Sequence, residues 1–128
     1  MNYLTDTHAL VWYFQADKRL GSNALKAFEG TMKKGRIIVP TIVLAEIMYI
    51  ARRGRISITF SETLHLIKQA ANFTVVTLDL DVLILADKIK ADLEMHDRLI
   101  AATSKKYKAP LLTKDEVIIA SDVVKTVW

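Results

Sequence analysis

The stretch RIIVPTIVLAEIMYIARRG, residues 36–54, holds the features that decide the fold. Branched residues at 37–39 predict a buried strand. Pro40 and Thr41 then begin a predicted helix, which Gly54 ends. A strand that leads directly into a helix is typical of chains in which strands and helices alternate around a parallel sheet.

The predicted helix carries one carboxylate, Glu46, among apolar residues. The side chains one turn away from it are all uncharged: Ile42, Val43, Tyr49 and Ile50. The nearest cations, Arg52 and Arg53, lie about two turns further on, roughly 9 to 10 Å along the axis. A buried carboxylate is normally neutralised, paired or bound to a metal, because an unpaired buried charge costs several kcal/mol. Glu46 therefore needs a partner from elsewhere in the chain.

Strand and helix signals alternate along the rest of the sequence. Branched and aromatic runs predict strands at residues 2–6, 36–40, 73–78, 110–113 and 123–128. The segments between them predict helices at 7–14, 22–34, 41–53, 60–71, 80–94, 97–107 and 115–120. Thr59 and Glu62 have the spacing of a capping box. This alternation predicts an α/β fold in which helices cover both faces of a parallel sheet.

Length and composition indicate one compact domain spanning residues 1–128, with 52% apolar and 25% charged residues. The chain has no cysteine, which excludes disulfides and thiolate chemistry, so a metal would be held by oxygen or histidine ligands. The opening residues lack the pattern of a secretory signal, and no uncharged run approaches the roughly 18 residues of a membrane span. We therefore expect a cytoplasmic protein with no membrane partner.

The charge balance favours a polyanionic partner. The net charge is +4, and basic residues gather in three clusters: Lys33, Lys34 and Arg36; Arg52, Arg53 and Arg55; Lys105, Lys106 and Lys108. Positive clusters suit the phosphates of a nucleic acid, but they also commonly solvate helix ends. The best candidates for a phosphate contact are Lys105, Lys106 and Lys108, with simple solvation as the equal alternative.

Four carboxylates fall where an open parallel sheet binds its ligands, at the carboxyl ends of the strands. Asp6 closes the first predicted strand, and Asp115 follows the fourth. Glu46 lies about one turn into the helix after the second strand, and Asp97 begins the helix DRLIAATSKKY. Side chains from four separate segments can therefore reach one end of the sheet.

The sequence places no cation between these acids, so their mutual repulsion would raise their pKa values unless metal ions lie among them. Oxygen ligands without sulfur favour Mg²⁺ or Mn²⁺, which serve phosphate chemistry by activating water and stabilising the leaving oxygen. Basic surface around such a pocket is what a nuclease needs. As a structural alternative, Asp6 and Asp97 would cap helices and Asp115 would lie in a turn.

Four segments, YLTDTHALVWYF, PTIVLAE, HDRLIAAT and LLTKD, resemble in their order and separation the PIN domain family and, within it, the VapC-type toxins. The resemblance covers nearly the whole chain. It implies a PIN-like three-layer α/β/α sandwich with a five-stranded parallel sheet. It also implies Mg²⁺- or Mn²⁺-dependent hydrolysis of RNA, a homodimer, and inhibition by a cognate VapB-type antitoxin.

The resemblance places the catalytic and metal-binding acids on Asp6, Glu46, Asp97 and Asp115. It places an auxiliary hydroxyl on Thr113, as a partner of a carboxylate or of a water on the metal. Glu94, three residues before Asp97, is a second auxiliary residue. The following Met95 and His96 depart from the proline and aromatic residue common in the family.

Other interpretations stand beside this one. A PIN-like module could bind RNA or a protein without cleaving. TVVTLDLDVL at 74–83 has the form of a haloacid dehalogenase motif, and Asp79 fits a response-regulator receiver by position. Too few residues follow Asp79 for the first, and the acid pair after the first strand is missing for the second, so Asp79 is predicted to cap a helix. Trp12 is predicted to be a core or interface residue, and the apolar helices 7–14 and 41–53 predict a dimer.

Overall fold

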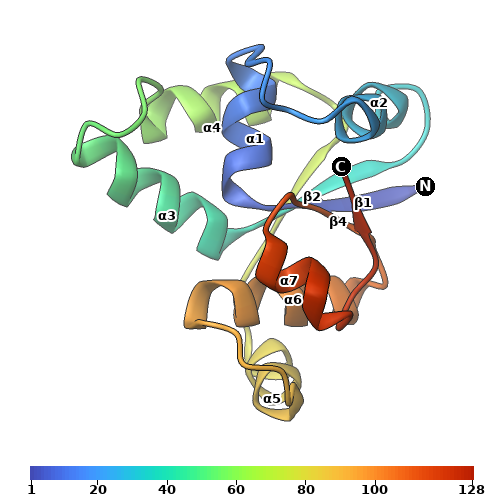
Figure 1. Cartoon of the computed structure of the whole chain (residues 1–128). Helices are drawn as coiled ribbons and strands as arrows, with labels where there is room; N and C mark the ends of the chain where they lie inside the picture. The colour runs from blue at the N-terminus through green and yellow to red at the C-terminus, as the bar shows by residue number, and fades with distance from the viewer.

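The computed structural model covers residues 1–128 and contains a five-stranded parallel sheet with helices on both faces (Figure 1). The strand order is β3-β2-β1-β4-β5, and every neighbouring pair is parallel. The predicted fold class is confirmed.

The strands are β1 (Asn2–Thr5), β2 (Arg36–Pro40), β3 (Phe73–Val76), β4 (Leu111–Leu112) and β5 (Thr126–Val127). The helices are α1 (Thr7–Phe14), α2 (Ser22–Thr31), α3 (Thr41–Arg52), α4 (Phe60–Gln69), α5 (Leu80–Lys88), α6 (Met95–Tyr107) and α7 (Glu116–Ser121). All five predicted strands and all seven predicted helices are present. The bounds of β2 and α1 are as predicted, and the other elements differ at one or both ends.

The order of the strands creates a switch point between β1 and β4. The chain moves from β1 through β2 to β3 in one direction and then crosses back to place β4 on the other side of β1. Right-handed crossovers therefore put α1, α2 and α4 on one side of the sheet and α5, α6 and α7 on the other (Figure 1). Ligands bind at the carboxyl ends of the strands at such a point.

The central strands are buried on both faces, which explains why they read as continuous apolar runs. Leu4, Ile37, Val39 and Leu111 are fully enclosed and belong to one core of 28 residues. The carboxyl end of β4 is followed by Thr113, a buried polar residue. The apolar core therefore ends at the carboxyl edge of the sheet, where a buried polar residue follows β4.

Several local predictions hold in detail. Thr59 and Glu62 form both hydrogen bonds of the predicted capping box at the start of α4. Asp79 caps α5 by accepting a bond from the Val82 N–H.

Gly35, just before β2, has φ +113°, and a Cβ there would lie 2.0 Å from the Met1 carbonyl oxygen. This position therefore requires glycine.

The largest difference from prediction lies between α5 and α6. The helix predicted over 80–94 ends at Lys88, and the next begins at Met95. The Arg98 guanidinium holds the intervening loop by donating to the carbonyls of Ala86, Ile89 and Ala91 at 2.6 to 3.1 Å. These bonds come from tertiary structure and compete with helix continuation. No helix of this structure has both the length and the apolar character needed to cross a membrane.

Candidate active site

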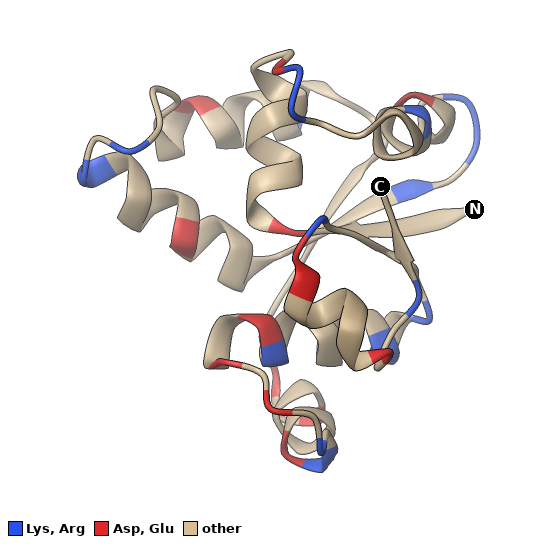
Figure 2. Ribbon diagram, viewed as in Figure 1, with Lys and Arg blue, Asp and Glu red and all other residues tan.

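A cavity of about 570 Å³ opens at the carboxyl edge of the sheet, beside the switch point. Its lining comes from α1, α3, α6, the connections around them and the β4–α7 connection: Asp6, Thr7, His8, Trp12, Arg19, Glu46, Glu94, Asp97, Ile100, Lys114 and Asp115. All four predicted carboxylates and the auxiliary Glu94 line it. Figure 2 shows these acidic segments, in red, at the starts of α1, α6 and α7 and in the middle of α3.

Asp6 and Asp115 are brought together because β1 and β4 are neighbours. The Asp6 N–H donates to the Leu112 carbonyl at 3.2 Å, which joins the ends of the two strands. Asp6 also caps α1 by accepting from the Ala9 N–H at 2.8 Å, and Asp115 caps α7 through the Ile118 N–H at 2.9 Å. Each cap uses one carboxylate oxygen, so capping leaves the other available to the cavity.

Thr113 lies between Asp6 and Asp115 and contacts both residues. Its side chain is fully buried, its hydroxyl accepts the Asp115 N–H at 3.1 Å, and the same hydroxyl is a hydrogen-bond partner of the Asp6 carboxylate. Thr113 therefore lies beside both acids, where the resemblance places an auxiliary hydroxyl. A buried hydroxyl held on both sides fixes the orientation of the acids that it contacts.

The hydrogen-bond partner of Glu46 is Thr7. The Thr7 hydroxyl, at the first position of α1, donates a hydrogen bond to the Glu46 carboxylate. The bond joins α1 to α3 across the cavity and involves no cation. Thr7 is absent from the residues predicted from the sequence, although its place directly after Asp6 was the available signal.

Asp97 lies inside the first turn of α6, which corrects the prediction that it begins the helix. Glu94 is the N-cap, and its carboxylate accepts the Asp97 N–H at 3.1 Å. The side chain of Asp97 is therefore not used as a cap. Glu94 is exposed but lines the same cavity, and His96 approaches it at 3.9 Å.

Burial and the neighbouring acids raise the pKa values of Asp97 and Asp6. Burial, followed by the charges of Asp115, Glu94, Glu46 and Asp6, raises the pKa of Asp97 from 3.8 to about 6. Burial also raises the pKa of Asp6, although the Thr113 hydroxyl, the Ala9 N–H and His8 oppose the shift. The fold thus keeps carboxylates together against their repulsion, as expected where a cation belongs.

The donor set fits a hard divalent cation. All the acids offer oxygen, as Mg²⁺ and Mn²⁺ prefer. The side chains do not bring three His, Asp or Glu groups within reach of one ion. Mg²⁺ usually keeps several waters and takes one or two carboxylates directly. Direct binding by two of the acids, with the others acting through water, is consistent with this arrangement.

Two cations, Arg19 and Lys114, also line the cavity, although the sequence predicts no cation between the acids. Arg19 forms an ion pair with Asp17, outside the cavity, and Lys114 forms no ion pair at all. Both cations instead lie over the indole of Trp12, 4.7 and 4.8 Å from its centre. Neither neutralises a carboxylate of the cavity.

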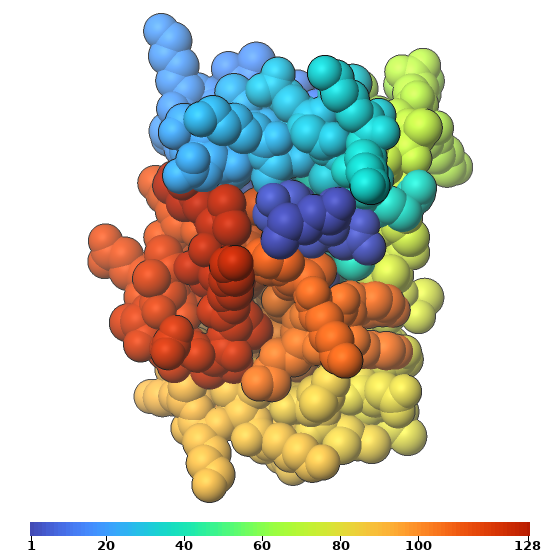
Figure 3. All heavy atoms as spheres, turned by 90° about the vertical axis from the view of Figure 1, so that its right-hand side faces the viewer, coloured from blue at the N-terminus to red at the C-terminus, as the bar shows by residue number.

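The lysines predicted to contact phosphate lie elsewhere. Lys105 is about 12 Å from Asp97 along α6, at 1.5 Å per residue, and Lys108 lies beyond the end of that helix. Lys106 is paired with Asp79. Figure 3 faces the opposite edge of the sheet and shows this end of α6, in orange, below the N-terminal residues. The three lysines therefore do not adjoin the acidic cavity.

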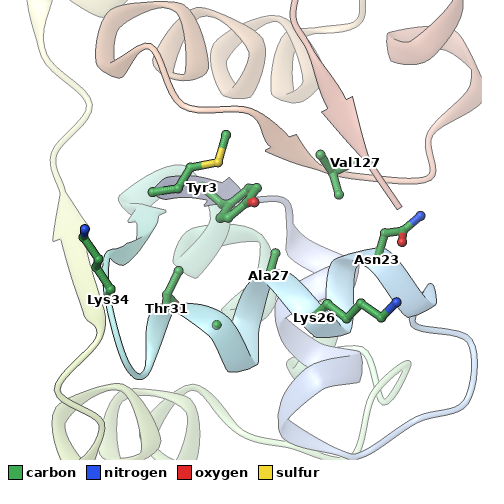
Figure 4. Close-up of a pocket in the computed structure, with 9 residues that line it drawn as sticks. Tyr3, Asn23, Lys26, Ala27, Thr31, Lys34 and Val127 are labelled. Carbon is green, nitrogen blue, oxygen red and sulfur yellow. The ribbon is translucent and has the colours of Figure 1, made fainter.

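A second hollow of about 400 Å³ lies beside α2 and the start of β1 (Figure 4). Tyr3, Lys26, Thr31 and Lys34 are among its lining residues, and no acid lines it. It offers no carboxylate oxygen to a metal. The cavity at the carboxyl edge is therefore the better candidate for the active site.

The raised pKa of Asp97 predicts how the metal-free protein responds to pH. The folded protein binds this proton near pH 6 and the unfolded chain near 3.8, so the contribution of Asp97 to stability rises as pH falls from about 7 to about 4. In EDTA, Asp97→Asn should therefore melt a few degrees above the original protein at about pH 7.5. The gap should close near pH 4.5. Thermal unfolding of both proteins across this range measures it, and a gap independent of pH would contradict it.

Comparison with known proteins agrees with this geometry. The PIN domain family matches residues 3–123. No curated protein matches the sequence significantly.

Several solved structures share the fold. VapBC2 from Rickettsia felis, bound to a DNA fragment from its promoter, has a TM-score of 0.74 at 16% identity, over 98% of this chain and 97% of that chain. VapC20 from Mycobacterium tuberculosis, a toxin that cleaves the sarcin-ricin loop, has a TM-score of 0.69 at 16% identity, over 98% and 99%. FitAcB from Neisseria gonorrhoeae gives 0.66 at 17% identity, over 98% and 96%. The family match over nearly the whole sequence, with the acids at the switch point of a five-stranded parallel sheet, shows that the chain belongs to the PIN domain family.

Proposed function

We propose that residues 1–128 act as one PIN domain that hydrolyses RNA phosphodiester bonds with Mg²⁺ or Mn²⁺, as a VapC-type toxin. The observation that carries this proposal is the convergence of Asp6, Glu46, Asp97 and Asp115, from four separate segments, on one cavity. The similarity to VapC20, a toxin that cleaves the sarcin-ricin loop, supports RNA as the substrate class.

The residues of the chain have separate roles in this proposal. Asp6, Glu46, Asp97 and Asp115 hold the metal, directly or through water, and Glu94 adds negative charge at the rim. When bound, a divalent ion supplies a Lewis acid that stabilises charge on the phosphate and lowers the pKa of water. Thr113 and Thr7 keep the Asp6 and Glu46 carboxylates in place through their hydroxyl bonds. One of these carboxylates would also orient the attacking water or receive its proton.

The proposed partners follow from the same comparisons. Solved complexes of this fold include VapBC from Salmonella typhimurium bound to DNA and a toxin-antitoxin complex from Klebsiella pneumoniae. We propose that a VapB-type antitoxin binds this chain and holds its activity in check. We further propose a homodimer, for which exposed Met48 and Tyr49 on the largely apolar helix α3 offer a surface.

A PIN-like module that binds RNA or a protein without cleaving it is the alternative. The lack of three acids within reach of one ion favours it, whereas the complete set of four carboxylates in one cavity favours the enzyme. The two possibilities differ in their response to metal.

Purified protein, freed of antitoxin, should cleave RNA in Mg²⁺ or Mn²⁺ and should lose that activity in EDTA. The Asp6→Asn protein, prepared identically, controls for contaminating nucleases. Gel analysis of labelled RNA measures the cleavage. If no RNA is cut in either metal, or if Asp6→Asn cuts equally well, the binding module becomes the better account.

A further inference from the structure

Trp12 forms a rigid platform at the edge of the acidic cavity. It lies on α1 and is only 5% exposed, yet it lines the cavity. The Trp128 ring meets it edge-on with centres 5.8 Å apart, and the His8 ring lies 5.6 Å away. This packing fixes the indole. The sequence-based interpretation of Trp12 as a core residue accounts for its burial but not for the charges that lie over it.

Two cations lie over this platform and both face the cavity. The Lys114 Nζ is 4.8 Å from the indole centre, and the Arg19 Cζ is 4.7 Å from it. Lys114 is fixed at its backbone because its neighbours, Thr113 and Asp115, share a hydrogen bond. Arg19 is oriented by bonds of 3.1 and 2.8 Å from its side chain to the Asp17 carboxylate. The backbone around Lys114 and the Asp17 carboxylate thus position the two cations, both of which are exposed.

Lys114 forms no ion pair although five acids line the same cavity. A cation–π contact at an exposed site is worth only about 0.5–1 kcal/mol. It can orient the ammonium group without neutralising its charge. Lys114 therefore keeps its positive charge available for an anion, while the acids of the same cavity are suited to a cation. Arg19 is paired with Asp17 through Nε and one terminal nitrogen, which leaves its other terminal nitrogen to contact an anion.

A phosphodiester chain matches this division of charge. One phosphate can bind a metal ion that the acids hold, and the next phosphate along the backbone can bind a cationic side chain. We propose that Lys114 and Arg19, held over Trp12, form a subsite for a backbone phosphate of single-stranded RNA, next to the phosphate at the carboxylates. The proposal rests on the proposed function for the nature of its ligand. The subsite positions substrate and takes no part in proton transfer.

Lys114→Gln tests the subsite, with Lys68→Gln as the matched control. Lys68 is an exposed lysine on α4, outside the cavity and without an ion pair, so both variants lose one positive charge. Binding of a labelled, mixed-sequence single-stranded RNA is measured in EDTA, where the metal cannot support cleavage. Lys114→Gln should weaken binding about 3- to 10-fold and lower the salt slope by about 0.7, as expected for one lost phosphate contact. Lys68→Gln should change neither, and Lys114→Arg should retain most of the affinity.

Kinetics provide a second measurement on the metal-loaded protein. Lys114→Gln and Arg19→Gln should raise KM with little change in kcat, because they remove binding that is equal in the ground and transition states. A Trp128→Phe protein leaves Trp12 as the single tryptophan. Its emission should change on addition of RNA, and this change should be smaller in the Lys114→Gln background.

The outcomes separate the subsite from the nuclease. If the original protein cleaves RNA and both variants bind and cleave as it does, the subsite is overturned and the proposed function stands. If the original protein binds RNA through Lys114 but never cleaves it, the nuclease is overturned and the subsite stands. If the original protein fails to bind RNA in low salt and shows no KM change with Lys114→Gln, the subsite is overturned.

Discussion

Replacing Asp97 or Asp6 with asparagine is expected to abolish metal-dependent RNA cleavage, lowering the rate about 10²- to 10⁴-fold. A bound metal contributes several kcal/mol of transition-state stabilisation, and each 1.36 kcal/mol corresponds to about tenfold in rate. Asparagine keeps the shape of aspartate but removes its charge, so the ligand is weakened without a change in packing. Single-turnover cleavage of labelled RNA at saturating Mn²⁺ measures the loss.

Both variants should remain folded, for different reasons. In Asp6→Asn the new side chain keeps an oxygen that can accept the Ala9 N–H, and asparagine is as good an N-cap as aspartate. Asp97 caps nothing and suffers the repulsion of four neighbouring acids, so its replacement should stabilise the metal-free protein. Asp87→Asn, an exposed substitution on α5 away from the cavity, is the control and should cleave normally. Full activity of pure Asp97→Asn protein would refute the assignment of the site.

Thr113→Val is expected to lower both activity and stability. Valine has nearly the same shape but no hydroxyl, so Asp6 and the Asp115 N–H both lose a partner at a fully buried position. Loss of a hydrogen bond that orients a ligand typically costs about 10- to 100-fold in metal affinity or activity. An unsatisfied buried polar group costs about 1–3 kcal/mol in the free energy of unfolding. Urea unfolding and a Mn²⁺ titration of cleavage measure the two effects.

Thr103→Val is the matched control for this substitution. Thr103 is equally buried, but its hydroxyl donates only to the Leu99 carbonyl one turn earlier in α6. Its replacement should leave the metal requirement unchanged. If Thr113→Val needs no more Mn²⁺ than Thr103→Val, then Thr113 stabilises the fold without orienting the acids.

The elements of the fold could be predicted from the sequence because their signals are local. The run 36–54 shows a strand, a helix start and a helix stop within 19 residues. Once the strands are parallel, the acids at their carboxyl ends are directed to one edge. The grouping of Asp6, Glu46 and Asp115 could therefore be foreseen without any knowledge of packing.

Features that depend on tertiary contacts could not be foreseen. The Thr7 hydroxyl reaches Glu46 across 39 residues of sequence, so no spacing rule relates the two. The contacts of Lys114 and Arg19 with the Trp12 ring bring together three segments of the chain, so no local pattern predicts them. The loop before α6 is held by Arg98 through carbonyls that the sequence does not distinguish from those of a continuing helix.

The proposed nuclease requires that the acids form a binding site for divalent ions, and the most direct measurement is anomalous diffraction from crystals grown with Mn²⁺. We predict a manganese peak inside the cavity, in contact with carboxylate oxygens among positions 6, 46, 97 and 115 or with waters bound to them. Well-ordered crystals in millimolar Mn²⁺ with no peak in the cavity, or with these carboxylates turned away from one another, would contradict it.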